Sequence, residues 1–358
     1  MLDTLRAIAI LMVLMRHAVH YDKQSPIGVF WNIWYNGWLG VDLFFALSGF
    51  LITHHLMCNW PKHNAKHYIY KYFRKRALRI LPLYIVIIII AGFSIVPYFK
   101  PDYTVSYLSV FVHAIFMQDY VYFTSILVPL WSLGVEEKFY LVAPILVYLF
   151  IKFKTTNIVG VGTIVILSIL ITRGWLLMKA PSLSYAEFFW QYRAPFHFSV
   201  AGILTGSLVA VVHSQLKDKN LDINKLRLLG YASLIILVVI LTIDRWLESE
   251  NWLMTNVIIF LSSICFAILI FCGIAAKPNA DTKIHKMLRF IAKLAFPLYL
   301  VHLMLLPMAK VIAASISASI PVSGFGIFLI IYIGLSFIGA AILHLAIEKP
   351  FLNIKDRL

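Results

Sequence analysis

Long apolar segments are the feature that most constrains what this sequence can fold into. Runs rich in Ile, Leu and Val occupy 157–171, 231–243 and 256–271. They lack the alternation of polar and apolar residues, over about ten residues, that is typical of a membrane β-strand. Only 13% of the residues are charged, against roughly 25% in a soluble domain. The sequence therefore predicts an all-α, polytopic integral membrane helix bundle, formed by one domain over 1–358 with no appended soluble domain.

The arrangement of basic loops predicts ten transmembrane spans with both termini in the cytoplasm. The loops 58–79, 214–227 and 276–293 are rich in Lys and Arg and alternate with loops that are not, and cytoplasmic loops carry the excess of basic residues. The segment 104–118 is apolar but short for a crossing, and we expect it to be re-entrant or to lie along the surface. The expected spans are 4–21, 38–57, 80–98, 131–150, 158–178, 196–213, 228–244, 253–275, 288–309 and 323–345.

The formal net charge of +15 raises the question of a nucleic-acid partner. Because the cations gather in alternate loops, we attribute them to membrane orientation, and we expect membrane lipid and no nucleic acid as partners. The three cysteines, Cys58, Cys265 and Cys272, lie in or beside spans and lack the spacing of metal ligands. We therefore expect no metal.

The first predicted span carries two ionisable side chains on one face. Arg6 and His17 have ten residues between them. In an α-helix this spacing places the two side chains within about 20° of the same face and roughly 16 Å apart along the axis. Such groups are costly inside a membrane and usually mark a functional cavity. The alternative is a histidine that only packs between helices and bonds to a neighbouring carbonyl.

Carboxylates enter two later spans from their outer ends. Asp42 either hydrogen-bonds the His17 imidazole or caps the start of its own helix. Glu136 and Glu137 are adjacent, and their side chains point about 100° apart. A carboxylate beside a neutral histidine orients it and stabilises its protonated form, as general-base catalysis requires. We favour Glu136, because Tyr140 four residues on extends the same polar face.

Arginines gather at the cytoplasmic mouth of the third predicted span. Arg76 and Arg79 are three residues apart and share a helical face. Guanidinium groups on one face suit the recognition of phosphates by paired hydrogen bonds. Anchoring on anionic lipid explains the same pattern equally well, and Arg74 fits that role better than the other two.

Several motifs in the right order make the chain resemble the membrane-bound acyltransferase-3 family, which modifies sugars of bacterial surface polymers. They are the opening 2–6 with the Arg6 and His17 spacing, the segment 40–51, the pair Arg76 and Arg79, the segment 131–137, and the ending 347–351. The resemblance covers nearly the whole chain. It implies a location in the bacterial plasma (inner) membrane.

The resemblance also implies a reaction. An acyl group, usually acetyl, is taken from acyl-CoA in the cytoplasm and delivered to a glycan hydroxyl beyond the membrane. Acetyl-CoA is then a donor substrate, and no cofactor is bound permanently. Either the chain acylates the glycan acceptor itself, or a separate extracytoplasmic transferase completes the transfer.

The residues singled out above take roles in that reaction. His17 is expected to be the base or a transient acyl carrier, with Glu136 or Glu137 as its partner. Arg6, Arg76, Arg79 and Arg74 are expected to bind the donor. The acceptor side is expected to include Asp42, Trp131, Ser132, Arg193, Tyr299 and His302, of which His302 is either catalytic or only packed.

Two other classes of protein fit parts of the pattern. A multi-pass transporter or flippase also buries Arg, His and Glu, but it should show inverted repeats and interrupted helices in matching positions, and the sequence shows neither. A scaffold subunit of a polysaccharide-assembly complex predicts no loss of acylation when His17 alone is changed.

Overall fold

The computed structural model describes the chain as a bundle of helices. The described residues are 1–21, 28–60, 64–101, 103–180, 183–216, 219, 221–243, 251–275, 282–317 and 324–357. Parts of the predicted basic loops, at 61–63, 217–218, 220 and 276–281, lie outside them. Within the described ranges every regular element is helical, so the predicted all-α class is confirmed.

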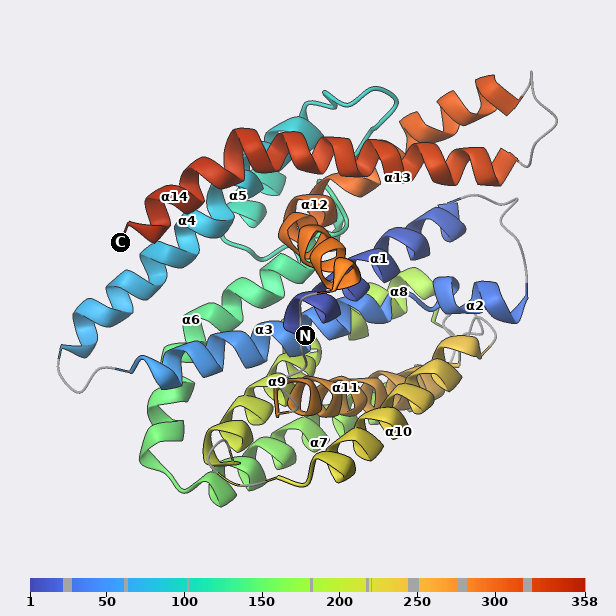
Figure 1. Ribbon diagram of the computed structural model, residues 1–358. Coiled ribbons are helices and arrows are strands. Elements are labelled where there is room, and N and C mark those ends of the chain that lie inside the picture. Colours follow the sequence, from blue (N-terminus) through green and yellow to red (C-terminus); the bar gives the residue numbers. More distant parts are fainter. Residues whose placement is uncertain are drawn as a thin grey trace.

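Each of the ten predicted spans overlaps a long helix (Figure 1). The segment 104–118, expected not to cross as a regular span, contains only a short helix, α5 (Tyr107–Ala114). The ten long helices are α1 (Leu2–Tyr21), α3 (Leu39–Cys58), α4 (Ala65–Gly92), α6 (Leu130–Lys152), α7 (Thr155–Lys179), α9 (Phe196–Leu216), α10 (Ile223–Thr242), α11 (Trp252–Ala275), α12 (Lys283–Ser317) and α13 (Gly324–Leu343).

The remaining elements are short. Between or after the long helices lie α2 (Val29–Tyr35), the 3-10 turn η1 (Tyr122–Thr124), α8 (Tyr185–Phe188), the π-helices η2 (Phe189–Arg193) and η3 (His344–Glu348), and α14 (Lys349–Asp356).

Seven of the described helical segments are long and apolar enough to cross a membrane by length and composition. Three other long helices, α1, α4 and α6, fall outside that set, and each carries ionisable residues that lower its hydropathy. These are the helices that hold Arg6 and His17, Arg76 and Arg79, and the two glutamates. The three long helices that are not apolar enough to be counted as spans by composition therefore carry the predicted catalytic and donor-binding residues.

The third predicted span is displaced in the structure. It was expected over 80–98, but α4 runs from Ala65 to Gly92. Much of the expected loop 58–79 is therefore helix. The helix begins where the Asn64 side chain accepts a hydrogen bond from the backbone N–H of His67, at 3.2 Å. The helix therefore starts in the basic segment, before the apolar run begins. A hydropathy pattern does not detect this part of the helix, because its residues are as polar as those of a loop.

Helix α1 lies between α12 and α3, and α3 packs along α9. The close contact between α3 and α9 requires glycine at two positions, because a side chain there would meet the backbone of the facing helix. A Cβ on Gly206 would lie 1.9 Å from the carbonyl oxygen of Ala46, and one on Gly49 would lie 1.9 Å from that of Ile203. Small residues at such positions let membrane helices approach closely.

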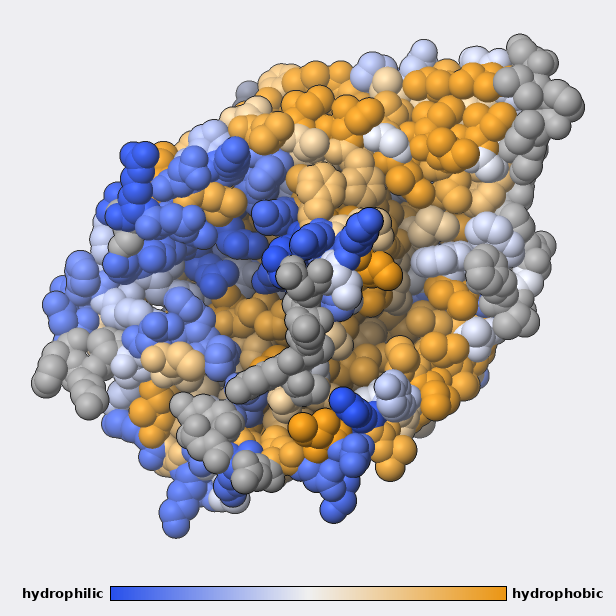
Figure 2. All heavy atoms as spheres, viewed as in Figure 1, coloured by the Kyte–Doolittle hydropathy of each residue, from blue (hydrophilic) through white to orange (hydrophobic). Residues whose placement is uncertain are grey.

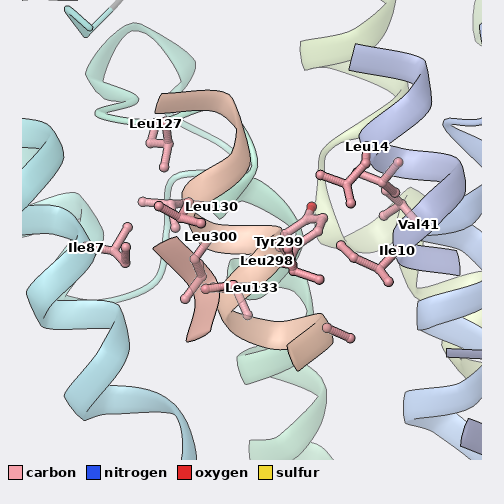
Figure 3. Close-up of a cluster of buried hydrophobic side chains, with 14 of the residues drawn as sticks. Ile10, Leu14, Val41, Ile87, Leu127, Leu130, Leu133, Leu298, Tyr299 and Leu300 are labelled. Carbon is pink, nitrogen blue, oxygen red and sulfur yellow. The ribbon is translucent and has the colours of Figure 1, made fainter. Parts of the chain in front are cut away.

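A buried apolar layer joins α1, α6 and α12. Figure 3 shows Leu298, Tyr299 and Leu300 of α12 among side chains from α1, α3 and α6, with Ile87 of α4 on the far side. Pro297 and Pro307 lie inside α12, and Figure 1 shows this helix changing direction along its length, as expected where proline removes a helical hydrogen bond. Tyr299 and His302 lie between the two prolines, and His302 contacts His17 of α1.

Polar side chains gather over one end of the molecule. Figure 2 shows hydrophilic residues over the end that carries the start of α4 and α14, whereas apolar residues cover much of the remaining visible surface. Exposed Ile and Leu side chains on α7 and α10, such as Ile164 and Leu228, belong to this apolar exterior. An exterior of this kind is suited to lipid rather than water.

Candidate active site

Two pockets share a wall inside the bundle. We call the first, of about 300 Å³, the arginine pocket, and the second, of about 230 Å³, the histidine pocket. Val41 of α3 and Tyr299 of α12 line both, so the two pockets are separated by these side chains. Because α1 passes from Arg6 in the first pocket to His17 in the second, the pockets follow one another along the bundle. The helical rise from Arg6 to His17 is roughly 16 Å.

The arginine pocket gathers basic side chains from three helices. Arg6 comes from α1, Arg76 and Arg79 from α4, and Lys293 from α12. The Arg76 guanidinium lies over the rings of Tyr72 and Tyr140, at 5.8 and 5.4 Å from their centroids. Cation–π contacts hold this guanidinium in place, so the pocket presents fixed cations to a bound anion.

Arg74 does not belong to this group. Its side chain is exposed and does not line the pocket. The position is two residues from Arg76, about 200° around the helix, and therefore on the opposite face of α4. The expectation that Arg74 binds the donor with the other arginines is not the arrangement found.

Glu136 lines the arginine pocket rather than the histidine pocket. Its carboxylate accepts hydrogen bonds from the Ser48 hydroxyl, at 3.1 Å, and from the Tyr140 hydroxyl. The shared polar face of Glu136 and Tyr140 is thus present. Glu137 lines neither pocket, because the adjacent position points about 100° away.

Lys138 pairs with Asp119 and not with the adjacent Glu137. Its ammonium group lies 2.5 Å from the carboxylate of Asp119 and donates to the carbonyl of Phe116. It therefore pairs with the segment before α6 and not with Glu137. Asp119 also accepts from the backbone N–H of Phe196, at 3.0 Å, which ties this segment to the start of α9.

Asp42 pairs with Arg193, and neither of the two roles expected for it is found. The two side chains are 2.7 Å apart and both are buried. The Arg193 guanidinium also lies over the rings of Trp38 and Trp131, at 5.1 and 5.5 Å. Arg193 and Trp131 line the histidine pocket, whereas Asp42 lines only a small cavity behind Arg193. The carboxylate holds the arginine at the pocket wall.

The histidine pocket is walled mainly by aromatic side chains. His17 and Arg16 supply its polar groups together with Arg193. The short elements α8 and η2 supply the aromatic rim, and the Trp190 ring of η2 stacks on Tyr122 of η1, outside the lining, at 5.8 Å. Its aromatic lining residues are Trp38, Trp131, Tyr185, Phe188, Phe189, Trp190 and Tyr299.

The His17 imidazole contacts another histidine and not a carboxylate. Nδ1 of His17 lies 2.9 Å from the carbonyl oxygen of Val13 and 3.2 Å from Nε2 of His302. The expected hydrogen bond between His17 and a glutamate is therefore not found, because Glu136 faces the other pocket. His302 is fully buried and lines neither pocket.

Tyr299 and Ser132 form the polar part of the wall between the pockets. The two hydroxyl oxygens are 2.7 Å apart, and the Tyr299 hydroxyl donates to the carbonyl of Pro129 at 3.1 Å. Ser132 faces the arginine pocket. Both residues were expected on the acceptor side, and the structure places them at the boundary.

Sequence reasoning did not single out some of the residues that the structure brings to the site. Ser48 and Lys293 line the arginine pocket, and Arg16 lines the histidine pocket. Arg173 is buried in α7 and donates to the Asn256 side chain at 2.5 Å. A lone arginine inside an apolar span was a signal available in the sequence; nothing comparable identifies Ser48.

Comparison with known proteins decides the family. A model of the acyltransferase domain (Acyl_transf_3) matches residues 1–345. The chain belongs to the acyltransferase-3 family. The resemblance inferred from the motifs is confirmed, and with the apolar helices it makes the chain a multi-pass membrane protein of this family.

Relatives of this acyltransferase-3 protein include two named O-acetyltransferases. It is 27% identical to O-acetyltransferase OatA of Staphylococcus aureus over 84% of this chain and 49% of the relative. It is 32% identical to peptidoglycan O-acetyltransferase OatA of Listeria monocytogenes over 42% of this chain and 24% of the relative. The chain thus spans about half the length, or less, of these relatives. No solved structure matches it.

Proposed function

We propose that this protein is a membrane O-acetyltransferase that moves acetyl from cytoplasmic acetyl-CoA to a sugar hydroxyl of a cell-surface glycan. The observation that carries the proposal is the pair of pockets of different chemistry that meet at Tyr299 and Val41. One is cationic and the other is aromatic with a histidine. Family membership and the two named O-acetyltransferases support the same reaction.

The arginine pocket suits the donor. Acyl-CoA carries several phosphates, and guanidinium groups bind phosphate through paired, charge-assisted hydrogen bonds. Arg76 and Arg79 lie near the middle of α4, whose start is at the polar end of the molecule (Figure 2). We assign this end to the cytoplasm because cytoplasmic segments carry the excess of basic residues. Arg6 lies on α1 along the way to the shared wall. The protein would then have both termini in the cytoplasm and lie in the bacterial inner membrane.

The histidine pocket suits the acceptor. Its aromatic walls offer flat apolar faces, and Arg16, His17 and Arg193 offer polar contacts. A pocket of mainly aromatic lining with a few fixed polar groups is typical of a site for a small ring-shaped ligand. A sugar unit of peptidoglycan or a related glycan fits this description, and the similarity to the peptidoglycan O-acetyltransferase of Listeria monocytogenes supports it.

His17 is the base of the proposed reaction. Its Nε2 takes the proton of the sugar hydroxyl, and the hydroxyl oxygen attacks the carbonyl carbon of the acetyl thioester. The C–O ester bond forms, the C–S bond breaks, and the departing CoA thiolate receives the proton from the imidazolium. Glu136 acts on the donor side in this scheme, because it lies among the cations of the arginine pocket.

Reconstituted protein tests the proposal. The purified chain in lipid nanodiscs, given acetyl-CoA and soluble peptidoglycan fragments, should release free CoA thiol and produce O-acetylated fragments by mass spectrometry. A transporter or flippase would consume no acetyl-CoA under these conditions. If acetyl-CoA binds and neither CoA thiol nor ester is formed with any glycan fragment, the proposal fails and a separate transferase is required.

A further inference from the structure

His302 stands directly behind His17, on a different helix. It is fully buried on α12, and its ring centroid is 4.9 Å from that of His17 on α1, with the planes tilted by 56°. It is one of the two histidines in contact at the site, but only His17 lines a pocket. His302 is therefore placed to act on His17 and not on a substrate.

The hydrogen bonds of the two rings fix where their protons are. Nδ1 of His302 lies 3.0 Å from the carbonyl oxygen of Leu298, and Nδ1 of His17 lies 2.9 Å from that of Val13. A carbonyl oxygen only accepts, so each Nδ1 must carry the proton. In the neutral rings both Nε2 atoms are then bare acceptors.

The contact between the rings agrees with this assignment. Nε2 of His302 is 3.2 Å from Nδ1 of His17, so a bare Nε2 meets an N–H. The His17 proton is shared between the Val13 carbonyl on its own helix and His302 on the next. Within the described residues, the Nε2 atom of His17 has no hydrogen-bond partner, and the residue lines the histidine pocket.

We propose that His302 is a positioning residue that holds His17 in the tautomer and orientation that direct its bare Nε2 at the acceptor hydroxyl. The inference rests on the proposed function, in which His17 is the base. The Val13 bond belongs to α1 and moves with it, whereas the His302 bond fixes the ring relative to α12. Since α12 also carries Tyr299, one helix sets both the base and the wall beside it.

A neutral partner has a physical advantage in this place. A buried carboxylate would add a full charge to the membrane interior, which is costly unless it is paired. The bare Nε2 of His302 still accepts from Nδ1–H when His17 becomes an imidazolium, so the protonated base is stabilised during the transfer. Other polar groups near His17 are Arg16 and His20 of α1, and Arg193 and Tyr299 at the pocket wall. Among the described residues, His302 alone forms a hydrogen bond with the ring from another helix.

Substitutions of His302 by side chains of different length test the inference. Gln at 302 is long enough to present a carbonyl oxygen near the position of Nε2, whereas Asn has the same amide on a side chain one methylene shorter. We expect His302→Gln to keep most of the activity. We expect His302→Asn and the ring-shaped, non-accepting His302→Phe to lower kcat for acetyl transfer roughly 10- to 100-fold, the range seen when a partner that orients an imidazole is removed. KM for acetyl-CoA should be unchanged, because the donor pocket is separate.

Nitrogen NMR of the full-length, 15N-histidine-labelled protein in nanodiscs supplies a readout that general damage would not produce. The signals of His17 are assigned from their loss in His17→Ala. In wild type and His302→Gln they should show a single Nδ1–H tautomer. In His302→Phe one of the two acceptors at Nδ1 is lost and the weaker hold of the Val13 carbonyl alone remains, so we expect a mixture. If the tautomer is retained in His302→Phe, or if kcat is unchanged in both His302→Asn and His302→Phe, the inference is wrong. An active His17→Ala protein would instead overturn the proposed function itself.

Discussion

His17 and Glu136 line different pockets, although the sequence suggested that they act together. Val41 and Tyr299 form the boundary between the two pockets. The partner of His17 is His302, and the partners of Glu136 are the Ser48 and Tyr140 hydroxyls. Under the proposed function, His17 then acts on the acceptor side and Glu136 on the donor side, and this changes what each substitution should do.

Arg79 should be sensitive to the shape of its side chain as well as to its charge. Lysine keeps the charge but cannot form paired hydrogen bonds to a phosphate. Since a hydrogen bond to a charged group contributes about 1.5–3 kcal/mol, Arg79→Lys should weaken acetyl-CoA binding at least tenfold, measured by calorimetry on the purified protein. Arg74→Ala, on the opposite face of α4, is the matched control and should bind normally. If Arg79→Lys binds acetyl-CoA as tightly as Arg74→Ala does, the arginine pocket is not the donor site.

Glu136→Gln should alter donor binding more than chemistry. The amide keeps the size of the side chain and removes a negative charge beside Arg76 and Arg79. We expect the Kd for acetyl-CoA to fall by about two- to fivefold, the effect of one partly screened charge. Glu137→Gln, which faces neither pocket, should leave Kd unchanged. If Glu136→Gln instead lowers kcat by orders of magnitude at constant Kd, the glutamate orients the base after all.

Helical geometry determines which contacts of the site could be predicted from the sequence: those within one helix could, and those between helices could not. The 3.6-residue period correctly placed Arg76 with Arg79, and Glu136 with Tyr140, because both pairs share one helix. It could not decide which helices face each other. Asp42 and Arg193 are far apart in the sequence and belong to α3 and η2, so their pairing depends on the packing of α3 and α9.

The same limit explains the partner of His17. Helix periodicity places His302 in a span, but its meeting with α1 depends on how α12 bends at its prolines. The long helices were predictable from apolar runs, whereas the start of α4 was not, because a basic helical segment has the hydropathy of a loop.

The buried pair of Asp42 and Arg193 should be important for stability. Asp42→Asn leaves a buried guanidinium without its charged partner, which costs about 3–5 kcal/mol in comparable cases. Thermal unfolding in detergent should show a large decrease in Tm. Lys225→Gln removes an exposed partner of Asp222, at 4.0 Å, and should change Tm little. A small effect of Asp42→Asn would mean that Arg193 finds another acceptor.

Two glycines offer a matched test of helix packing. Gly206→Ala would place a Cβ 1.9 Å from the Ala46 carbonyl oxygen, so α3 and α9 would have to separate. We expect a marked loss of thermal stability. A Cβ on Gly160 meets nothing within 4 Å, and Gly160→Ala should stabilise α7 by up to about 1 kcal/mol. Similar Tm values for the two variants would contradict the close contact of α3 with α9.

Under the proposed function, His17 performs the transfer and is not needed to bind the donor. The most direct measurement compares wild type, His17→Ala and His20→Ala, the last being an exposed histidine on the same helix. In each, acetyl-CoA binding is measured by calorimetry and O-acetyl groups on cell-surface glycans by mass spectrometry. We predict that all three proteins bind acetyl-CoA equally and that His17→Ala alone produces no O-acetylated glycan. Wild-type levels of O-acetylated glycan with His17→Ala would contradict the account.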